Sequence, residues 1–155
     1  MYISRIFLAV ALGAACTAAT VLAQEERIQR SDLPAAVQKA IDQQSRGATV
    51  RGFSKETEDG QTIYEAELTT KGRSTDISMD ANGKVVEIEE EVPVDSLSDA
   101  VKQGLQRKAG KGKIGKVESL TKNGRLVAYE AEVTTGTKRS EIQVGPDGKP
   151  LAHEE

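Results

Sequence analysis

The stretch YEAELTT at Tyr64–Thr70 returns almost unchanged as YEAEVTT at Tyr129–Thr135. In both copies apolar and polar residues alternate, so tyrosine, alanine and the aliphatic residue point to one face of a strand and the glutamates to the other. Recurrence of such a unit within one chain indicates a repeated architecture. The two stretches therefore predict half-buried β-strands in equivalent positions.

An amphipathic helix is predicted before each of these strands. LPAAVQKAI (Leu33–Ile41) and LSDAVKQGL (Leu97–Leu105) both carry apolar residues at helical spacing. Between each helix and its strand the apolar residues are spaced by three, as at Val50 and Phe53, which indicates a β-bulge or a late helix end. Capping residues are available before both helices, Ser31 or Asp32 in the first half and Asp95 or Ser96 in the second.

Turn signals divide the rest of each half into short strands. Strands are expected around Ile77 and Ile142, with closing strands at Val86–Ile88 and at Leu151. Four Asn-Gly or Asp-Gly pairs are typical of tight hairpin turns, namely Asp59-Gly60, Asn82-Gly83, Asn123-Gly124 and Asp147-Gly148.

These elements predict an α+β fold made of two tandem repeats. Each repeat would place one helix on one face of a three- to four-stranded antiparallel β meander, with residues 24–93 in the first repeat and residues 94–155 in the second. One helix covers only one face of its sheet, which we expect to be the face of Tyr64 and Tyr129, so the other face is open to solvent or to a partner. Because a unit of about 60 residues buries little apolar surface, we expect the repeats to pack together, and continuation of one sheet through both is one way to do so.

The first residues have the features of a secretory signal. Met1–Ala23 contains an early basic residue, Arg5, then a largely apolar run, and ends in the small-residue sequence VLA. Cleavage is predicted after Ala23, which gives a periplasmic or secreted protein with no membrane span after cleavage. Lipidation of Cys16 is the alternative. Removal of residues 1–23 would leave no cysteine, which excludes disulfides, thiol catalysis and cysteine-bound metals.

Charge and residue content argue against several classes of function. The chain has 21 basic and 24 acidic residues and a net charge of −3, so nucleic acid is not an expected partner. His153 is the single histidine, and the sequence contains no grouping of a nucleophile, a base and metal ligands. We therefore predict a protein that is not an enzyme and has no cofactor.

The glutamates of the repeated stretches are candidate binding residues. Side chains two residues apart on a strand lie about 7 Å from each other on one face. Such carboxylate pairs could bind Ca²⁺ or a basic partner, or act as acid and base if a pocket raised one pKa, or remain solvated. The residues concerned are Glu65, Glu67, Glu130 and Glu132.

A second candidate is the basic, glycine-containing stretch QRKAGKGKIGKV at Gln106–Val117. It is interpreted as a flexible connection after the second helix. Its lysines could dock on an acidic partner or on anionic lipid of the envelope. The candidate contact residues are Lys111, Lys113 and Lys116.

The sequence resembles the PepSY and PepSY-like families. The resemblance implies an exported, non-catalytic module of the kind associated with restraint of peptidases, and its tandem form is similar in architecture to secreted β-lactamase inhibitory proteins. The matching motifs are Leu33–Val37, Tyr64–Glu67 and Asp80–Val85 in the first half, and Leu97, Ala100, Val101, Tyr129–Glu132 and Asp147–Lys149 in the second.

The predicted function is that of an exported binding module. It would act on an envelope protein or peptide through the open sheet face, the basic stretch or both, in the manner of a peptidase or enzyme inhibitor. The alternative is an envelope protein that responds to a cation or small ligand, such as a Ca²⁺ binder.

Overall fold

The computed structural model describes residues 25–58 and 60–155. The predicted signal segment Met1–Ala23, its cleavage site and Cys16 lie outside the described residues. Within the described ranges, no helix combines the length and the apolar composition needed to cross a membrane.

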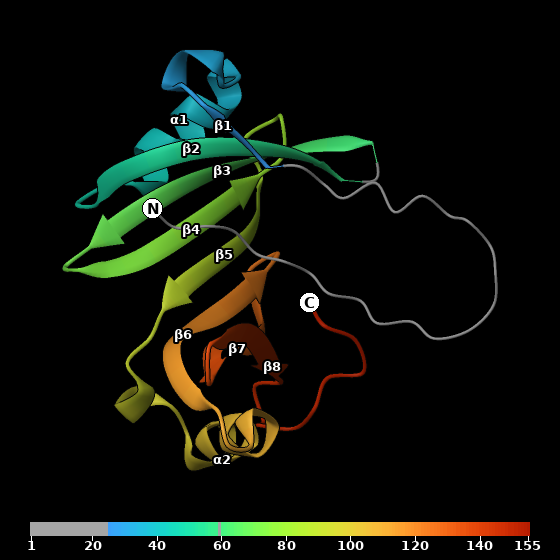
Figure 1. The fold of residues 1–155 in the computed structure, drawn as a ribbon. Coiled ribbons are helices and arrows are strands. Elements are labelled where there is room, and N and C mark those ends of the chain that lie inside the picture. The colour runs from blue at the N-terminus through green and yellow to red at the C-terminus, as the bar shows by residue number, and fades with distance from the viewer. Residues whose placement is uncertain (1–24, 59) are drawn as a thin grey trace.

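In the described part of the chain, eight strands form one antiparallel sheet in which each strand pairs with the next along the chain (Figure 1). Helix α1 (Ala35–Gln44) follows a 3-10 turn, η1 (Arg30–Asp32), and helix α2 (Asp99–Ala109) follows a second one, η2 (Val94–Ser96). The strands are β1 (Glu26–Ile28), β2 (Thr49–Glu58), β3 (Gln61–Thr70), β4 (Arg73–Met79), β5 (Val85–Glu91), β6 (Lys113–Lys122), β7 (Arg125–Thr135) and β8 (Lys138–Val144).

The predicted fold class, in which each of two repeats has its own helix and meander, is wrong because the described strands form a single sheet. Strand β5 pairs with β6 from Glu87–Lys122 to Glu91–Glu118. Side-chain alternation indicates which face a residue occupies, but it does not indicate which strand lies alongside. The unpaired backbone groups at the edge of one four-stranded meander are satisfied by the next meander. Leu151 lies after β8 and not in the predicted closing strand.

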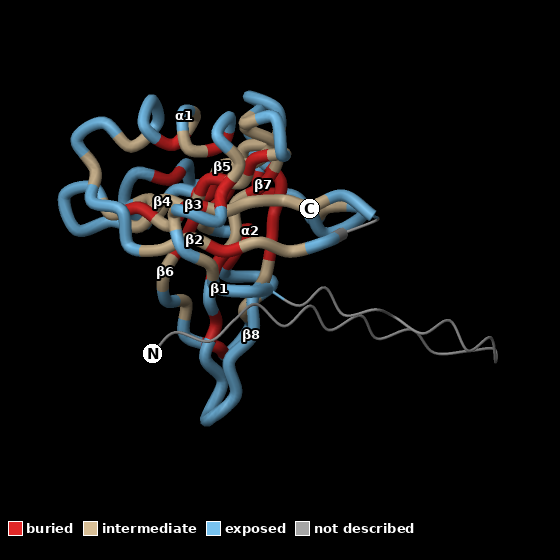
Figure 2. Tube along the Cα trace, turned by 90° about the horizontal axis from the view of Figure 1, so that it is seen from above, coloured by how far each residue is buried: buried red, intermediate tan, exposed pale blue. Residues whose placement is uncertain are grey.

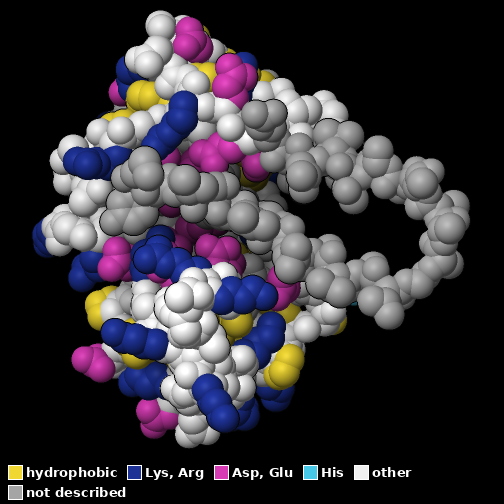
Figure 3. Space-filling model, viewed as in Figure 1, with side chains coloured by type: hydrophobic (Ala, Val, Ile, Leu, Met, Phe, Trp, Pro, Cys, Tyr) yellow, Lys and Arg dark blue, Asp and Glu magenta, His cyan; other side chains and the backbone are white. Residues whose placement is uncertain are grey.

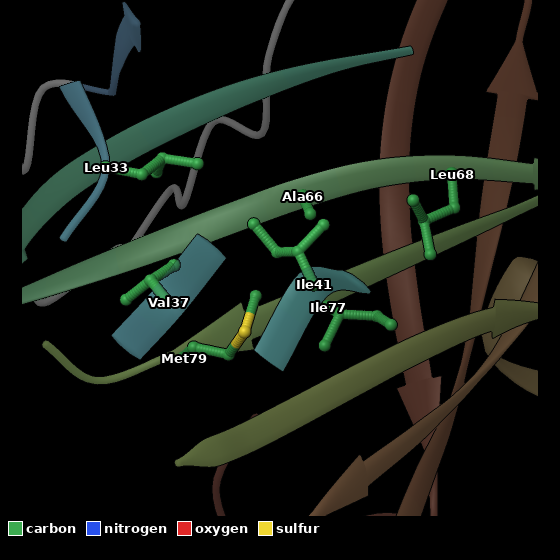
Figure 4. Close-up of a cluster of buried hydrophobic side chains, with 7 residues drawn as sticks. All are labelled: Leu33, Val37, Ile41, Ala66, Leu68, Ile77 and Met79. Carbon is green, nitrogen blue, oxygen red and sulfur yellow. The ribbon is translucent and has the colours of Figure 1, made fainter. Parts of the chain in front are cut away.

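Both helices pack on the same face of this sheet. The repeated tyrosines, Tyr64 and Tyr129, lie against one cluster each, as predicted. Figure 4 shows the α1 side chains directed at those of β3 and β4, and Figure 2 shows buried residues beneath the helices. The first cluster contains Leu33, Val37, Ile41, Ala66, Leu68, Ile77 and Met79, and the second contains Leu97, Val101, Leu105, Val117, Ala131 and Val144.

The helices begin later than their predicted caps. Asp32 is engaged in η1, where its carboxylate accepts a hydrogen bond of 2.9 Å from the Gln29 N–H, so α1 begins only after Pro34. Helix α2 begins after Ser98, whose hydroxyl oxygen accepts a hydrogen bond of 3.3 Å from the Val101 N–H. In both halves the predicted caps lie within the 3-10 turn that precedes the helix, and sequence propensity alone does not reveal such a turn.

The predicted bulges are confirmed in both halves. The pairing register shifts between Val50 and Gly52 in β2 and between Ile114 and Val117 in β6. A late helix end is excluded as the cause, since α1 and α2 end well before these positions. Bulges increase the local twist of a strand, which helps this sheet to curve.

Glycine in the turn after β8 allows that turn to contact α2 closely. Gly148 has a φ of +75°, and a Cβ atom at this position would lie 2.0 Å from the carbonyl oxygen of Ala100. A Cβ atom on Gly104 of α2 would in turn lie 2.2 Å from the Gly148 carbonyl oxygen. The turn and the helix therefore meet backbone to backbone, without room for a methyl group.

Gly148→Ala should lower the free energy of unfolding by roughly 3 kcal/mol, because left-handed strain of about 1–2 kcal/mol adds to overpacking of about 1–3 kcal/mol. Gly136→Ala is the matched control, since Gly136 has a φ of +63° and a Cβ atom there would meet no described atom within 4 Å. It should cost only about 1–2 kcal/mol, as measured by urea denaturation. Equal losses in the two variants would contradict the close contact with α2.

Candidate functional site

We call the sheet surface opposite the helices the open face. Directly paired residues share a face of a sheet, so the pairs Glu67–Asp76, Asp76–Glu89 and Glu118–Glu130 all lie there. Acidic residues outnumber basic ones on this face. By register it carries Glu65, Glu67, Asp76, Glu87, Glu89, Glu91, Glu118, Glu130, Glu132 and Glu141, together with Arg27, Lys113, Lys116, Lys122 and Arg139.

Three carboxylates of the open face form a tight group, which we call the acidic cluster: Asp76 on β4, Glu89 on β5 and Glu118 on β6. Each offers an oxygen atom, and these atoms all lie within 4.8 Å of one another. Glu89 and Glu118 are only 5% and 6% exposed. Buried like charges at this separation repel one another, so neighbouring donors and cations must stabilise them.

Ser74 and Lys116 stabilise the β6 side of the acidic cluster. The Ser74 hydroxyl donates to Glu118 Oε1 at 3.4 Å and reaches Glu91 Oε2 at 3.3 Å. Lys116 Nζ lies 2.9 Å from Glu118 Oε1. Burial opposes the charge of Lys116, but the hydrogen bond to Glu118 and the charges of Glu118, Glu132 and Asp76 outweigh it and raise the lysine pKa. Lys116 is therefore an internal cation of this surface.

Arg27 on β1 provides a second cation on the open face, away from the acidic cluster. Its Nη2 donates to Glu67 Oε2 at 3.2 Å, and its Nη1 pairs with Glu67 Oε1, which gives a two-point contact. The guanidinium reaches from β1 to β3 by crossing β2 above Gly52. A Cβ atom on Gly52 would lie 2.3 Å from Arg27 Nη1, so any other residue at this position would displace the guanidinium from its present path.

The predicted glutamates share the open face, but they do not form one site. Glu65 and Glu67 lie on β3, whereas Glu130 and Glu132 lie on β7, with three strands between. The prediction of a flexible basic connection is wrong for most of its length, because Gln106 lies in α2 and Lys113–Lys122 forms β6. Of the predicted lysines, Lys111 lies in the turn, and Lys113 and Lys116 lie in β6.

Sequence reasoning missed the acidic cluster. Glu89 lies just beyond the predicted closing strand at Val86–Ile88, yet the observed strand β5 continues to Glu91. The alternation of Glu87, Glu89 and Glu91 was the available signal, because it matches one face of a strand. In Figure 3, acidic side chains gather across the middle of the molecule, and basic ones are prominent over the β6–β8 half.

Comparison with known proteins gives a family and a fold. The family described as "Putative beta-lactamase-inhibitor-like, PepSY-like" matches residues 20–86 and 62–149. No curated protein sequence matches the chain.

Solved structures with a similar fold come from Bacteroides species. A "putative periplasmic" protein from Bacteroides eggerthii has a TM-score of 0.62 at 18% identity, over 77% of this chain and 86% of that one. A BLIP-like protein from Bacteroides fragilis has a TM-score of 0.57 at 23% identity, over 79% and 85%. A DUF2874 family protein from Bacteroides ovatus has a TM-score of 0.60 at 17% identity, over 77% and 84%.

The raised pKa of Lys116 predicts a pH dependence of stability. The folded chain holds this proton more tightly than the unfolded chain, so the contribution is complete below the unfolded lysine pKa of about 10.4 and is lost as pH rises through the higher folded value. The stability difference between wild type and Lys116→Met should stay constant up to about pH 10 and then shrink.

Urea denaturation from pH 7 upward measures this difference, with Lys111→Met in the exposed turn as the control. That control should change stability by less than about 0.5 kcal/mol at neutral pH. A wild-type advantage over Lys116→Met that persisted unchanged beyond about pH 12 would rule out the charge of Lys116 as its source.

Proposed function

Because the chain belongs to the PepSY-like family, which is described as β-lactamase-inhibitor-like, we propose that it is an exported, non-catalytic module that binds an envelope protein or peptide through the open face. Three observations support the proposal. The family description is inhibitor-like, the B. eggerthii neighbour is described as periplasmic, and both helices lie on one face of the sheet and leave the other uncovered by a helix.

The charge of the open face indicates what kind of partner it binds. Acidic side chains from β3 to β8 dominate it, so a partner of complementary charge presents lysine or arginine. The chain has no tryptophan, and both repeated tyrosines lie on the helix side. Binding is therefore driven by charge more than by aromatic anchors, which makes it fast and sensitive to salt.

The candidate residues have distinct roles in this proposal. Glu65, Glu67, Glu130 and Glu132 contact basic groups of the partner from two separate strands. Lys111 in the turn before β6 and Lys113 at the start of β6 contact acidic groups at the margin of the same partner. Lys116 holds Glu118 in place and contributes to binding only indirectly.

Charge reversal tests the open face. The double variant Glu65→Lys/Glu67→Lys should bind decalysine at least about tenfold more weakly than wild type at low salt, a loss of about 1.4 kcal/mol. It should also fail to capture any envelope protein that the wild-type chain captures in a cross-linking experiment. Calorimetry measures the peptide affinity, and circular dichroism establishes that the variant is folded.

Asp95→Lys/Asp99→Lys is the control, because it makes the same change in net charge at exposed positions in η2 and at the start of α2. Its affinity for decalysine should stay within about threefold of wild type. Equal loss in both variants would show that net charge, and not the open face, governs binding.

The acidic cluster favours a second candidate function, response to a divalent cation. Ca²⁺ takes six to eight oxygen ligands, and the cluster supplies three carboxylates whose oxygens lie within 4.8 Å of one another. Glu25, Glu65 and Glu67 form another such group, but Glu25 is exposed. The cluster is the better candidate, although the ammonium group of Lys116 competes for Glu118.

Calcium should raise the melting temperature if the cluster binds it, because a ligand selective for the folded state stabilises that state by about 2.7 kcal/mol at 100 times its Kd. Scanning calorimetry with Ca²⁺, and with Mg²⁺ for comparison, measures the shift. Glu118→Gln should reduce the Ca²⁺ shift, whereas Glu141→Gln on the exposed part of β8 should leave it unchanged. An equal shift in both variants would exclude the cluster as the site.

A further inference from the structure

Residues Leu151–Glu155, which we call the tail, cross onto the open face after the turn that follows β8. Figure 1 shows this segment in red, running from the α2 end of the molecule toward the open side of the sheet. The Glu155 N–H donates to Gln143 Oε1 at 2.8 Å, and Gln143 Nε2 donates to the main-chain oxygen of Glu155 at 3.4 Å. One side-chain amide thus contacts both main-chain groups of one tail residue.

Gln143 is prepared for this role by Glu130. The glutamine side chain belongs to a residue that is only 3% exposed, and its Nε2 also donates to Glu130 Oε2 at 2.8 Å. A carboxylate accepts hydrogen bonds, so Glu130 fixes which end of the amide carries the N–H groups. The carbonyl oxygen and the second N–H are therefore directed at the tail. This geometry suits any extended main chain, because it uses no atom specific to Glu155.

A side-chain contact adds selectivity next to this main-chain contact. Lys122 Nζ lies 3.6 Å from Glu155 Oε2 and 3.5 Å from Glu87 Oε2. Glu154 reaches Lys108 of α2 at 3.7 Å. Both positions therefore favour acidic residues in the bound segment. The surface around Glu65 and Glu67 instead favours basic residues.

The contacts that hold the tail are few. Residues 152–155 are exposed, and ion pairs of this kind at the surface contribute about 0–1 kcal/mol each. The tail stays in place largely because its attachment gives it an effective concentration in the millimolar range. A separate segment with the same features can replace it at comparable concentrations.

We propose that Gln143, Glu130 and Lys122 form a binding position for an extended peptide with an acidic side chain, and that the tail occupies this position until a partner segment displaces it. Gln143 binds the main chain, and Lys122 pairs with the acidic side chain. The proposal rests on the proposed function, since it makes the tail a competitor of the partner on the open face. The proposed binding position lies on a different part of the open face from Glu65 and Glu67.

A full-chain variant that frees the position provides the test. Glu155→Pro removes both the N–H that Gln143 binds and the carboxylate that Lys122 binds. A synthetic peptide of residues 149–155 should shift the Gln143 side-chain NH₂ signals of this variant at concentrations at least tenfold lower than in wild type, as followed by NMR. Glu→Gln changes at both glutamates of the peptide should weaken its binding several-fold.

Further variants distinguish peptide binding by Gln143 from a merely structural role of this residue. Adding Gln143→Met to Glu155→Pro should abolish peptide binding, while adding Gln103→Met at an exposed position of α2 should not. In wild type, the Glu155 amide should exchange with solvent at least several-fold more slowly than in Gln143→Met. Unprotected exchange in wild type, or no peptide binding by folded Glu155→Pro at about 10 mM, would overturn the proposal. Either result leaves decalysine binding through Glu65 and Glu67 intact.

Discussion

The backbone pairing between β5 and β6 is the constraint on which the structure depends. Without it, each half would expose a full strand edge and would have to find a partner elsewhere. With it, both helices share one side of a continuous sheet, and neither helix covers the opposite side. The same pairing brings Glu118 on β6 into the group formed with Asp76 and Glu89, so a group of three carboxylates lies at the junction of the two halves.

A surface with this much negative charge requires internal compensation. Arg27 pairs with Glu67, Lys116 with Glu118, and Lys122 with Glu87, so cations are distributed across the width of the sheet. Neutral donors complete the arrangement. Ser74 reaches two carboxylates, and the Gln143 amide satisfies Glu130. The face is therefore a structured network whose side chains are held in defined positions, which is the condition for selective binding.

The sequence was most informative where a pattern depends on one strand or one helix alone. Alternation in the repeated YEAE stretches correctly placed Tyr64 and Tyr129 on the helix side, and a spacing of three correctly indicated bulges near Gly52 and Val117. The pairing of β5 with β6 could not be read in this way, because neighbouring strands interact through backbone groups that every residue shares. The acidic cluster was missed for the same reason, since its members come from three strands.

Strand order in the described sheet follows chain order from β1 to β8 without a crossover. Each strand after β1 therefore pairs with the strand that comes just before it in the chain. No two paired strands have another strand between them in the sequence. Contacts between residues close in sequence lower the entropic cost of folding and speed it. A chain with this topology can therefore assemble its sheet progressively from the amino end.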